Sequence, residues 1–113
     1  MQNGGFYPLT NVGKNMKYDL SKYTPKANKN YKKIKDLCRM HKINLIVITT
    51  PMCKNTVNRN YFKELKKRYP EIHNFEDVVI DDEYFSSCGH LNVDGAKIFT
   101  QHIIASLKDS KKL

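Results

Sequence analysis

Residues 88–100 read CGHLNVDGAKIFT, and this stretch decides how the last third of the chain folds. Asn92 suits the N-cap position of a helix, because its side-chain oxygen can accept a backbone N–H of the first turn. Asp94 would lie in that turn, where the helix dipole favours a negative charge. Apolar residues then recur at helical spacing, which predicts a helix over residues 93–107. Its inward-facing side chains are expected to be Ala96, Phe99, Ile103 and Leu107.

This arrangement predicts that His90 lies on a short loop just before a helix. An imidazole that a rigid element holds on a loop can serve as a general base. An ordinary loop histidine beside a helix cap is the alternative interpretation. Spacing alone favours the ordinary loop histidine.

Upstream, two helices and one strand are predicted. Ile43–Thr49 is a nearly continuous apolar and β-branched run that ends at Pro51, which is typical of a buried parallel strand. Apolar residues at helical spacing predict helices over residues 28–41 and 58–69. Val78–Ile80 has the highest β-propensity for a second strand.

The order of helices and strands predicts the fold class. Strands that alternate with helices imply an α/β fold with parallel pairing. Residues 1–27 are predicted to form an N-terminal arm or loop, and residues 28–113 the α/β segment. Working sites in such sheets lie at the carboxyl ends of the strands. Thr49 and Thr50 are therefore expected near His90.

The string His90–Phe99 resembles the last motif block of the SGNH/GDSL hydrolases, in particular their envelope-associated, acyltransferase-like branch. There, His-Leu-Asn-x-x-Gly-Ala-x-x-Phe carries the catalytic histidine. Leu45–Pro51 resembles the strand and Thr-Pro turn that precede this block. The resemblance implies a partial three-layer α/β/α sandwich, flavodoxin-like, with a short parallel sheet. It also places the second strand at Ile72–Phe75 rather than Val78–Ile80, and this assignment is adopted here.

The chain departs from that family in the rest of the catalytic machinery. The family's nucleophile is a serine in a Gly-Asp-Ser-like string, and no serine here follows a Gly-Asp pair. The segments that supply oxyanion donors are also missing. Ser87 stands where the family places the aspartate that orients the histidine. A hydroxyl can hold a tautomer but cannot stabilise imidazolium by charge. The candidate catalytic residues are therefore His90 and Ser87, with Asp77, Asp81 and Asp82 as alternative partners of the imidazole.

The resemblance implies the C-terminal segment of an acyl-ester hydrolase or acyltransferase that is inactive alone. A missing N-terminal portion, or a second chain at the unpaired sheet edge, would complete it. The substrate would be an acylated glycan or a small ester, with no metal and no organic cofactor. A non-catalytic binding module and a small basic protein that binds anionic polymers are the alternatives.

The composition limits the classes of partner that this chain is expected to bind. The net charge is +9, but only 3 of the 20 basic residues are arginine, the side chain preferred for bidentate phosphate contacts. The lysines fall mostly on the polar faces of predicted helices, which disfavours a nucleic-acid site. No apolar run reaches the roughly 18 residues of a membrane span. Residues 1–8 do not read as a signal peptide. The location stays open, although the resembling family is often found in the cell envelope.

The cysteines argue against both a disulfide framework and a zinc ribbon, because their number is odd and no Cys-x-x-Cys pair occurs. Cys38 and His41 could ligate a metal together with Cys53 or His73, but a buried thiol is favoured. A nucleophilic pair of Cys88 with His90 is disfavoured, because such pairs are usually distant in sequence. The three cysteines are Cys38, Cys53 and Cys88.

Overall fold

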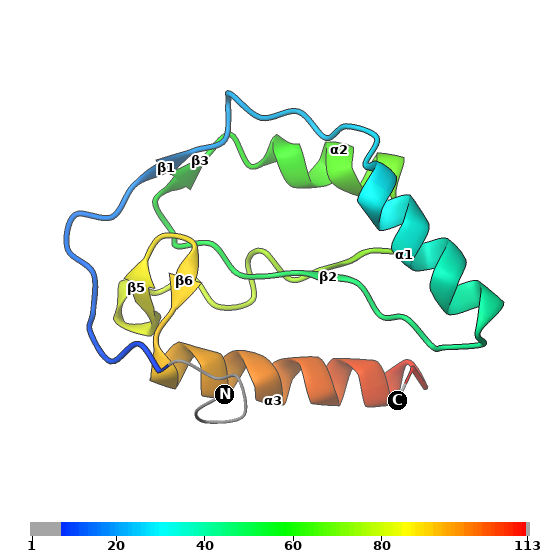
Figure 1. Cartoon of the computed structure of the whole chain (residues 1–113). Coiled ribbons are helices and arrows are strands. Elements are labelled where there is room, and N and C mark those ends of the chain that lie inside the picture. Colours follow the sequence, from blue (N-terminus) through cyan, green and yellow to red (C-terminus); the bar gives the residue numbers. More distant parts are fainter. Residues whose placement is uncertain (1–7, 113) are drawn as a thin grey trace.

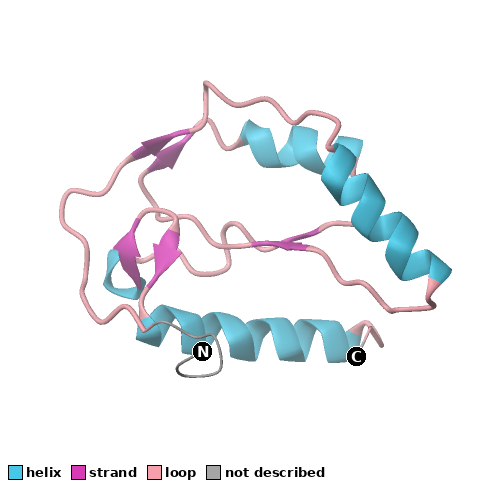
Figure 2. Cartoon of the chain, in the orientation of Figure 1, coloured by secondary structure: helices cyan, strands magenta, loops and turns pink. Residues whose placement is uncertain are grey.

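The helices occur where apolar residues recur at helical spacing and where a capping residue or a proline marks one end of the segment. The structure, a computed structural model, describes residues 8–112. Helix α1 spans Lys29–Met40, α2 spans Asn60–Arg68 and α3 spans Val93–Asp109 (Figures 1 and 2). The three predicted helices are therefore confirmed to within a few residues at each end. Within this part of the chain, no helix is both long enough and apolar enough to cross a membrane.

Two strands form the parallel pair that the sequence predicts. β2 (Ile48–Thr49) pairs with β4 (His73–Asn74), with Ile48 opposite His73. The assignment of a strand within Ile72–Phe75 is confirmed over the alternative at Val78–Ile80. β2 is shorter than the predicted strand 43–49, because β4 offers it a partner over only two residues. In Figure 1, α3 lies on one side of this pair and α2 on the other.

The remaining strands form two further short pairs instead of extending that sheet. β1 (Tyr18–Asp19) runs parallel to β3 (Thr56–Val57). β5 (Phe85–Ser87) and β6 (His90–Leu91) form an antiparallel hairpin, preceded by the short helix η2 (Asp82–Tyr84). The described residues thus have mixed α/β content in three separate two-stranded pairs.

The N-terminal arm is not simply a loop, because it contains β1 and bonds to the end of the chain. The Leu9 carbonyl accepts the Val93 amide at 2.8 Å, and the Gly13 amide donates to the Phe85 carbonyl at 2.9 Å. A Cβ at Gly13 would lie 2.6 Å from the Ser86 carbonyl oxygen, so only glycine allows this close approach. The arm is thereby tied to the hairpin and to the start of α3.

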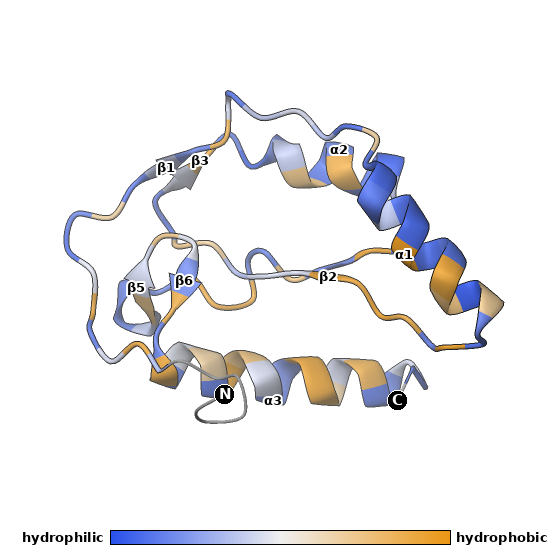
Figure 3. Ribbon diagram, viewed as in Figure 1, coloured by the Kyte–Doolittle hydropathy of each residue, from blue (hydrophilic) through white to orange (hydrophobic). Residues whose placement is uncertain are grey.

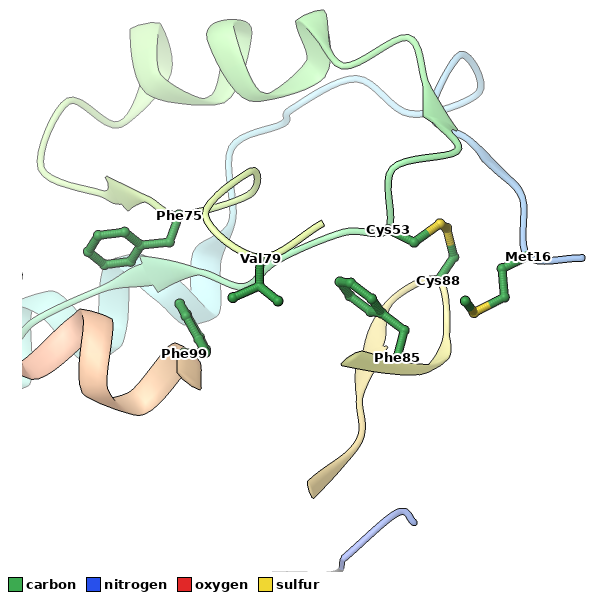
Figure 4. Close-up of a cluster of buried hydrophobic side chains, with 7 residues drawn as sticks. All are labelled: Met16, Cys53, Phe75, Val79, Phe85, Cys88 and Phe99. Carbon is green, nitrogen blue, oxygen red and sulfur yellow. A yellow bond between two sulfur atoms is a disulfide. The ribbon is translucent and has the colours of Figure 1, made fainter. Parts of the chain in front are cut away.

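The core joins the arm, the segments after β2 and β4, the hairpin and α3 around buried aromatic and sulfur-containing side chains (Figure 4). Phe85 and Cys53 are fully buried. Phe75 and Phe99 meet edge to face, with ring centroids 6.0 Å apart. Phe99 brings α3 to the end of β4 in this way. The cluster consists of Met16, Cys53, Phe75, Val79, Phe85, Cys88 and Phe99.

One predicted apolar stripe remains uncovered. Helix α1 has no buried residue, and Ile34, Leu37 and Met40 are 50%, 55% and 73% exposed. Figure 3 shows this face of α1 and the apolar segment that leads into β2. Among residues 8–112, no strand pairs with the second edge of β2. An apolar face and an open strand edge therefore lie close together in sequence and unpartnered in the described chain.

Candidate functional site

The site begins at the N-terminus of α3, where Asn92 acts as the predicted cap. Its Oδ1 accepts the Gly95 amide at 3.0 Å, and its Nδ2 donates to the Glu83 carbonyl at 2.7 Å. Asn92 is only 3% exposed. A Cβ at Gly95 would lie 2.2 Å from the Tyr84 carbonyl oxygen, so glycine lets the helix start against η2. These contacts fix the helix immediately after His90.

The prediction that His90 lies on a loop is wrong, because His90 belongs to β6. Residues Cys88 and Gly89 form a tight turn, and the chain then runs back along β5 with Ser87 opposite His90. A two-residue turn allows the flanking residues to pair as a hairpin. The His90 side chain is exposed on this hairpin.

The hairpin register brings the two candidate catalytic side chains together. Ser87 Oγ lies 2.7 Å from His90 Nδ1, and Ser86 Oγ donates to the His90 carbonyl at 3.2 Å. The contact expected from the resemblance is therefore present, and its catalytic role stays a prediction. Engagement of Nδ1 leaves Nε2 as the nitrogen available for proton transfer.

No carboxylate takes the place of Ser87. Among residues 8–112, no Asp or Glu side chain forms an ion pair with His90. Asp82 instead lies in η2, where its Oδ1 is buried without a hydrogen-bond partner. The alternative partners Asp77, Asp81 and Asp82 are thus not brought to the imidazole.

A disulfide joins Cys53 to Cys88, although the odd number of cysteines argued against disulfide bonding (Figure 4). The number of cysteines is odd because Cys38 is free. The two bonded cysteines are separated by 35 residues, so no short spacing motif indicates that they pair. The Cys53 amide also donates to the Cys88 carbonyl at 2.9 Å. The hairpin turn is thereby fixed to the segment after β2.

The disulfide also rules out the Cys88–His90 nucleophilic pair and a metal site that uses Cys53. Cys88 carries no thiolate to pair with His90, and Cys53 is not available as a metal ligand. In the described part of the chain, no three His, Cys, Asp or Glu side chains are grouped so that they could hold a metal ion.

An apolar cleft of about 530 Å³ lies beside the Ser87–His90 pair. Neither Thr49 nor Thr50 lines it, contrary to the expectation that they share an edge with His90. Thr49 Oγ1 instead donates to Asn74 Oδ1 at 2.7 Å and accepts the Phe75 amide at 2.9 Å, which ties it to β4. The cleft is lined by Lys17, Tyr18, Leu20, Tyr23, Met52, Tyr61, Phe62, Ser87, Cys88, Gly89 and His90.

Sequence reasoning missed an ion pair that supports this cleft. Arg59 donates to the Cys53 carbonyl at 2.7 Å and to the Met52 carbonyl at 3.1 Å, and it forms a salt bridge with Glu76. Burial raises the pKa of the Glu76 carboxyl, although the Arg59 charge opposes this effect. The two residues are 17 positions apart, and nothing local in the sequence marks them as partners.

No protein-family model, curated protein or solved structure matches this chain. The resemblance to the SGNH/GDSL hydrolases therefore depends on the residues of the motif themselves.

Proposed function

We propose that this chain is the C-terminal segment of an SGNH/GDSL-type acyl-ester hydrolase or acyltransferase, with His90 as the general base. The observation that carries the proposal is the 2.7 Å contact between Ser87 Oγ and His90 Nδ1. The contact lies directly before a helix start that the buried Asn92 fixes. This placement restrains the ring at both the side chain and the backbone.

The chemistry follows from the free ring nitrogen. With Nδ1–H donated to Ser87, the Nε2 lone pair of neutral His90 accepts the proton of an attacking hydroxyl. The hydroxyl oxygen bonds to the acyl carbon, the ester C–O bond breaks, and the imidazolium returns its proton to the leaving alcohol. Ser87 fixes the tautomer without a charge, so it supports the imidazolium less than a carboxylate would.

The nucleophile and the oxyanion donors would come from elsewhere, either from a missing N-terminal portion or from a second chain. The open edge of β2 and the exposed face of α1 support such a complement. The complement would extend the β2–β4 pair into the sheet of a three-layer sandwich. The substrate would be an acylated glycan or a small ester.

A non-catalytic binding module is the second candidate function. The cleft favours it, because a largely apolar cleft with few polar groups is sufficient for binding without any nucleophile. The disulfide that fixes the cleft wall would serve binding as well as catalysis.

The decisive experiment reads the DNA upstream of Met1 and assays the encoded protein with a short-chain nitrophenyl ester. An in-frame Gly-Asp-Ser string, with turnover that His90→Gln abolishes and His102→Gln retains, would support the enzyme.

The 113-residue chain alone should show no turnover above background and no labelling by a fluorophosphonate, because it lacks the nucleophile block. Labelling of Ser87 would contradict its role as a positioning residue. A longer protein that turns over ester independently of His90 would overturn the proposal.

A further inference from the structure

The cleft beside the Ser87–His90 pair has the properties of a small-molecule site. Its volume of about 530 Å³ falls within the range of ligand pockets. Its walls come from four separate parts of the chain. These are the arm around β1, Met52 in the segment after β2, the start of α2, and the hairpin turn held by the Cys53–Cys88 disulfide. The chain thus brings distant segments together around one cleft.

The body of the cleft is apolar. Tyr18 and Tyr23 stack with an interplanar angle of 11° and ring centroids 6.2 Å apart. The Tyr18 hydroxyl donates to the Tyr23 hydroxyl at 3.2 Å, so part of the hydrogen-bonding capacity of these phenols is used within the pair. Met52 and Phe62 add further apolar surface. A ligand would therefore meet mainly ring faces and aliphatic carbon.

The polar groups of the cleft favour an anion. Apart from the tyrosines, the polar side chains that line it belong to Lys17, Ser87 and His90. No Asp, Glu, Asn or Gln side chain is among the residues lining this cleft. A sugar would find few acceptors for its hydroxyls there. A carboxylate, in contrast, could receive charge-assisted hydrogen bonds from the ammonium group and from the Ser87–His90 pair.

We propose that this cleft binds an aliphatic carboxylate of the fatty-acid type. The chain of the ligand lies against the Tyr18–Tyr23 stack and Phe62, and its carboxylate faces Lys17 and the Ser87–His90 pair. The inference does not rest on the proposed acyl transfer, because binding requires no proton transfer and no nucleophile.

Titration calorimetry of the oxidised chain with decanoate, decanol and decyltrimethylammonium tests the ligand class. Decanoate should bind most tightly, and decanol about two- to fivefold more weakly, because the polar groups are partly exposed. The cation should bind most weakly, and maltose should not bind. Equal affinity for the anion and the cation, or tighter binding of maltose, would overturn the proposal.

Two pairs of variants locate the site. Lys17→Met should weaken decanoate about two- to fivefold and leave decanol unchanged, whereas Lys22→Met removes an exposed lysine of the same arm outside the cleft. Tyr23→Ser should weaken both ligands, and Met40→Ser, on the exposed face of α1, should weaken neither. Equal effects of Lys17→Met and Lys22→Met would mean that only net charge matters, against the proposal.

A third variant separates this inference from the enzymatic one. His90→Gln should weaken decanoate by no more than the two- to fivefold expected for Lys17→Met, because Lys17 and the apolar walls remain, whereas it should abolish ester turnover by the longer protein. A chain that binds decanoate but belongs to no active ester hydrolase would uphold the site and refute the acyl-transfer function. An active hydrolase whose cleft does not bind decanoate would uphold the acyl-transfer function and refute the carboxylate site.

Discussion

Asn92 accepts the backbone N–H of Gly95 at 3.0 Å, and this bond fixes the start of α3 directly behind the hairpin that carries His90. Asn92→Ala should lower the free energy of unfolding by about 2–3 kcal/mol. The variant loses the cap and also leaves the Glu83 carbonyl, whose bond to Asn92 is partly buried, without its donor. Urea denaturation at pH 7 measures the loss.

Asn28 provides the matched control for this prediction. It caps α1 by accepting the Tyr31 amide at 3.0 Å, but it is exposed. Asn28→Ala should cost about 1 kcal/mol or less. Equal losses for the two variants would show that the second bond of Asn92, to the Glu83 carbonyl, contributes nothing.

The Cys53–Cys88 disulfide should contribute strongly to stability. It closes a loop across a separation of 35 residues, for which the chain-entropy relation gives about 4 kcal/mol. The double variant Cys53→Ser, Cys88→Ser should lose up to this amount in urea denaturation. Cys38→Ser is the control and should change stability little, because Cys38 is the free cysteine. Three titratable thiols in the non-reduced, denatured protein would contradict the disulfide itself.

Ser87→Asp should raise the pKa of His90, because a nearby anion favours the protonated imidazole. The shift should be modest, since both side chains are exposed and solvent screens the pair. NMR titration of the His90 ring protons measures it. Ser86→Asp is the control, because Ser86 contacts the His90 carbonyl and not the ring. An unchanged titration in Ser87→Asp would show that the two side chains do not meet in solution.

The acid side of the stability curve should depend on Glu71. The Tyr31 hydroxyl and the Lys35 ammonium bond to its carboxylate and lower its pKa from 4.5 to about 2. Because the folded pKa is depressed, the contribution to stability is present above about pH 5 and is lost as the pH falls towards 2. Tyr31→Phe should therefore cost less than about 1 kcal/mol at pH 7, since the Glu71 side chain is 42% exposed and solvent screens its interactions, and almost nothing at pH 2.

Denaturation at both pH values checks this, with Glu64→Gln as the control. Glu64 forms an exposed ion pair with Lys67 on the same helix, so this variant should change stability little at either pH. A Tyr31→Phe loss that is as large at pH 2 as at pH 7 would indicate lost packing instead of the hydrogen bond.

The features that the sequence predicted well are those with local physical causes. The cap at Asn92 and the stop before Pro70 are short-range signals, and the structure has helix ends at both places. The parallel pairing of β2 follows from its position between helices. Helical spacing also predicted α1, but it could not tell that Ile34 and Leu37 would remain exposed, because periodicity reveals an apolar face and not what covers it.

The features that were missed depend on long-range geometry. The disulfide that holds Cys88 helps to turn the chain back at Gly89, and His90 then pairs in a strand instead of lying on a loop. The Arg59–Glu76 pair likewise joins segments that only the tertiary fold brings together. The cleft beside His90 combines residues of the arm and of the hairpin, so no single stretch of sequence predicts it.

The bond between the Leu9 carbonyl and the Val93 amide has a consequence for biosynthesis. The ribosome releases the arm early, but the hairpin and helix that receive it are made late. In a nascent chain that has not yet reached α3, β1 of the arm can therefore pair with β3, but the Leu9 end of the arm has no partner. Contacts of such long range form slowly, and incomplete chains expose apolar segments meanwhile. This protein should therefore acquire its native arm only after translation of α3, and until then its exposed apolar segments would make it a client for a chaperone.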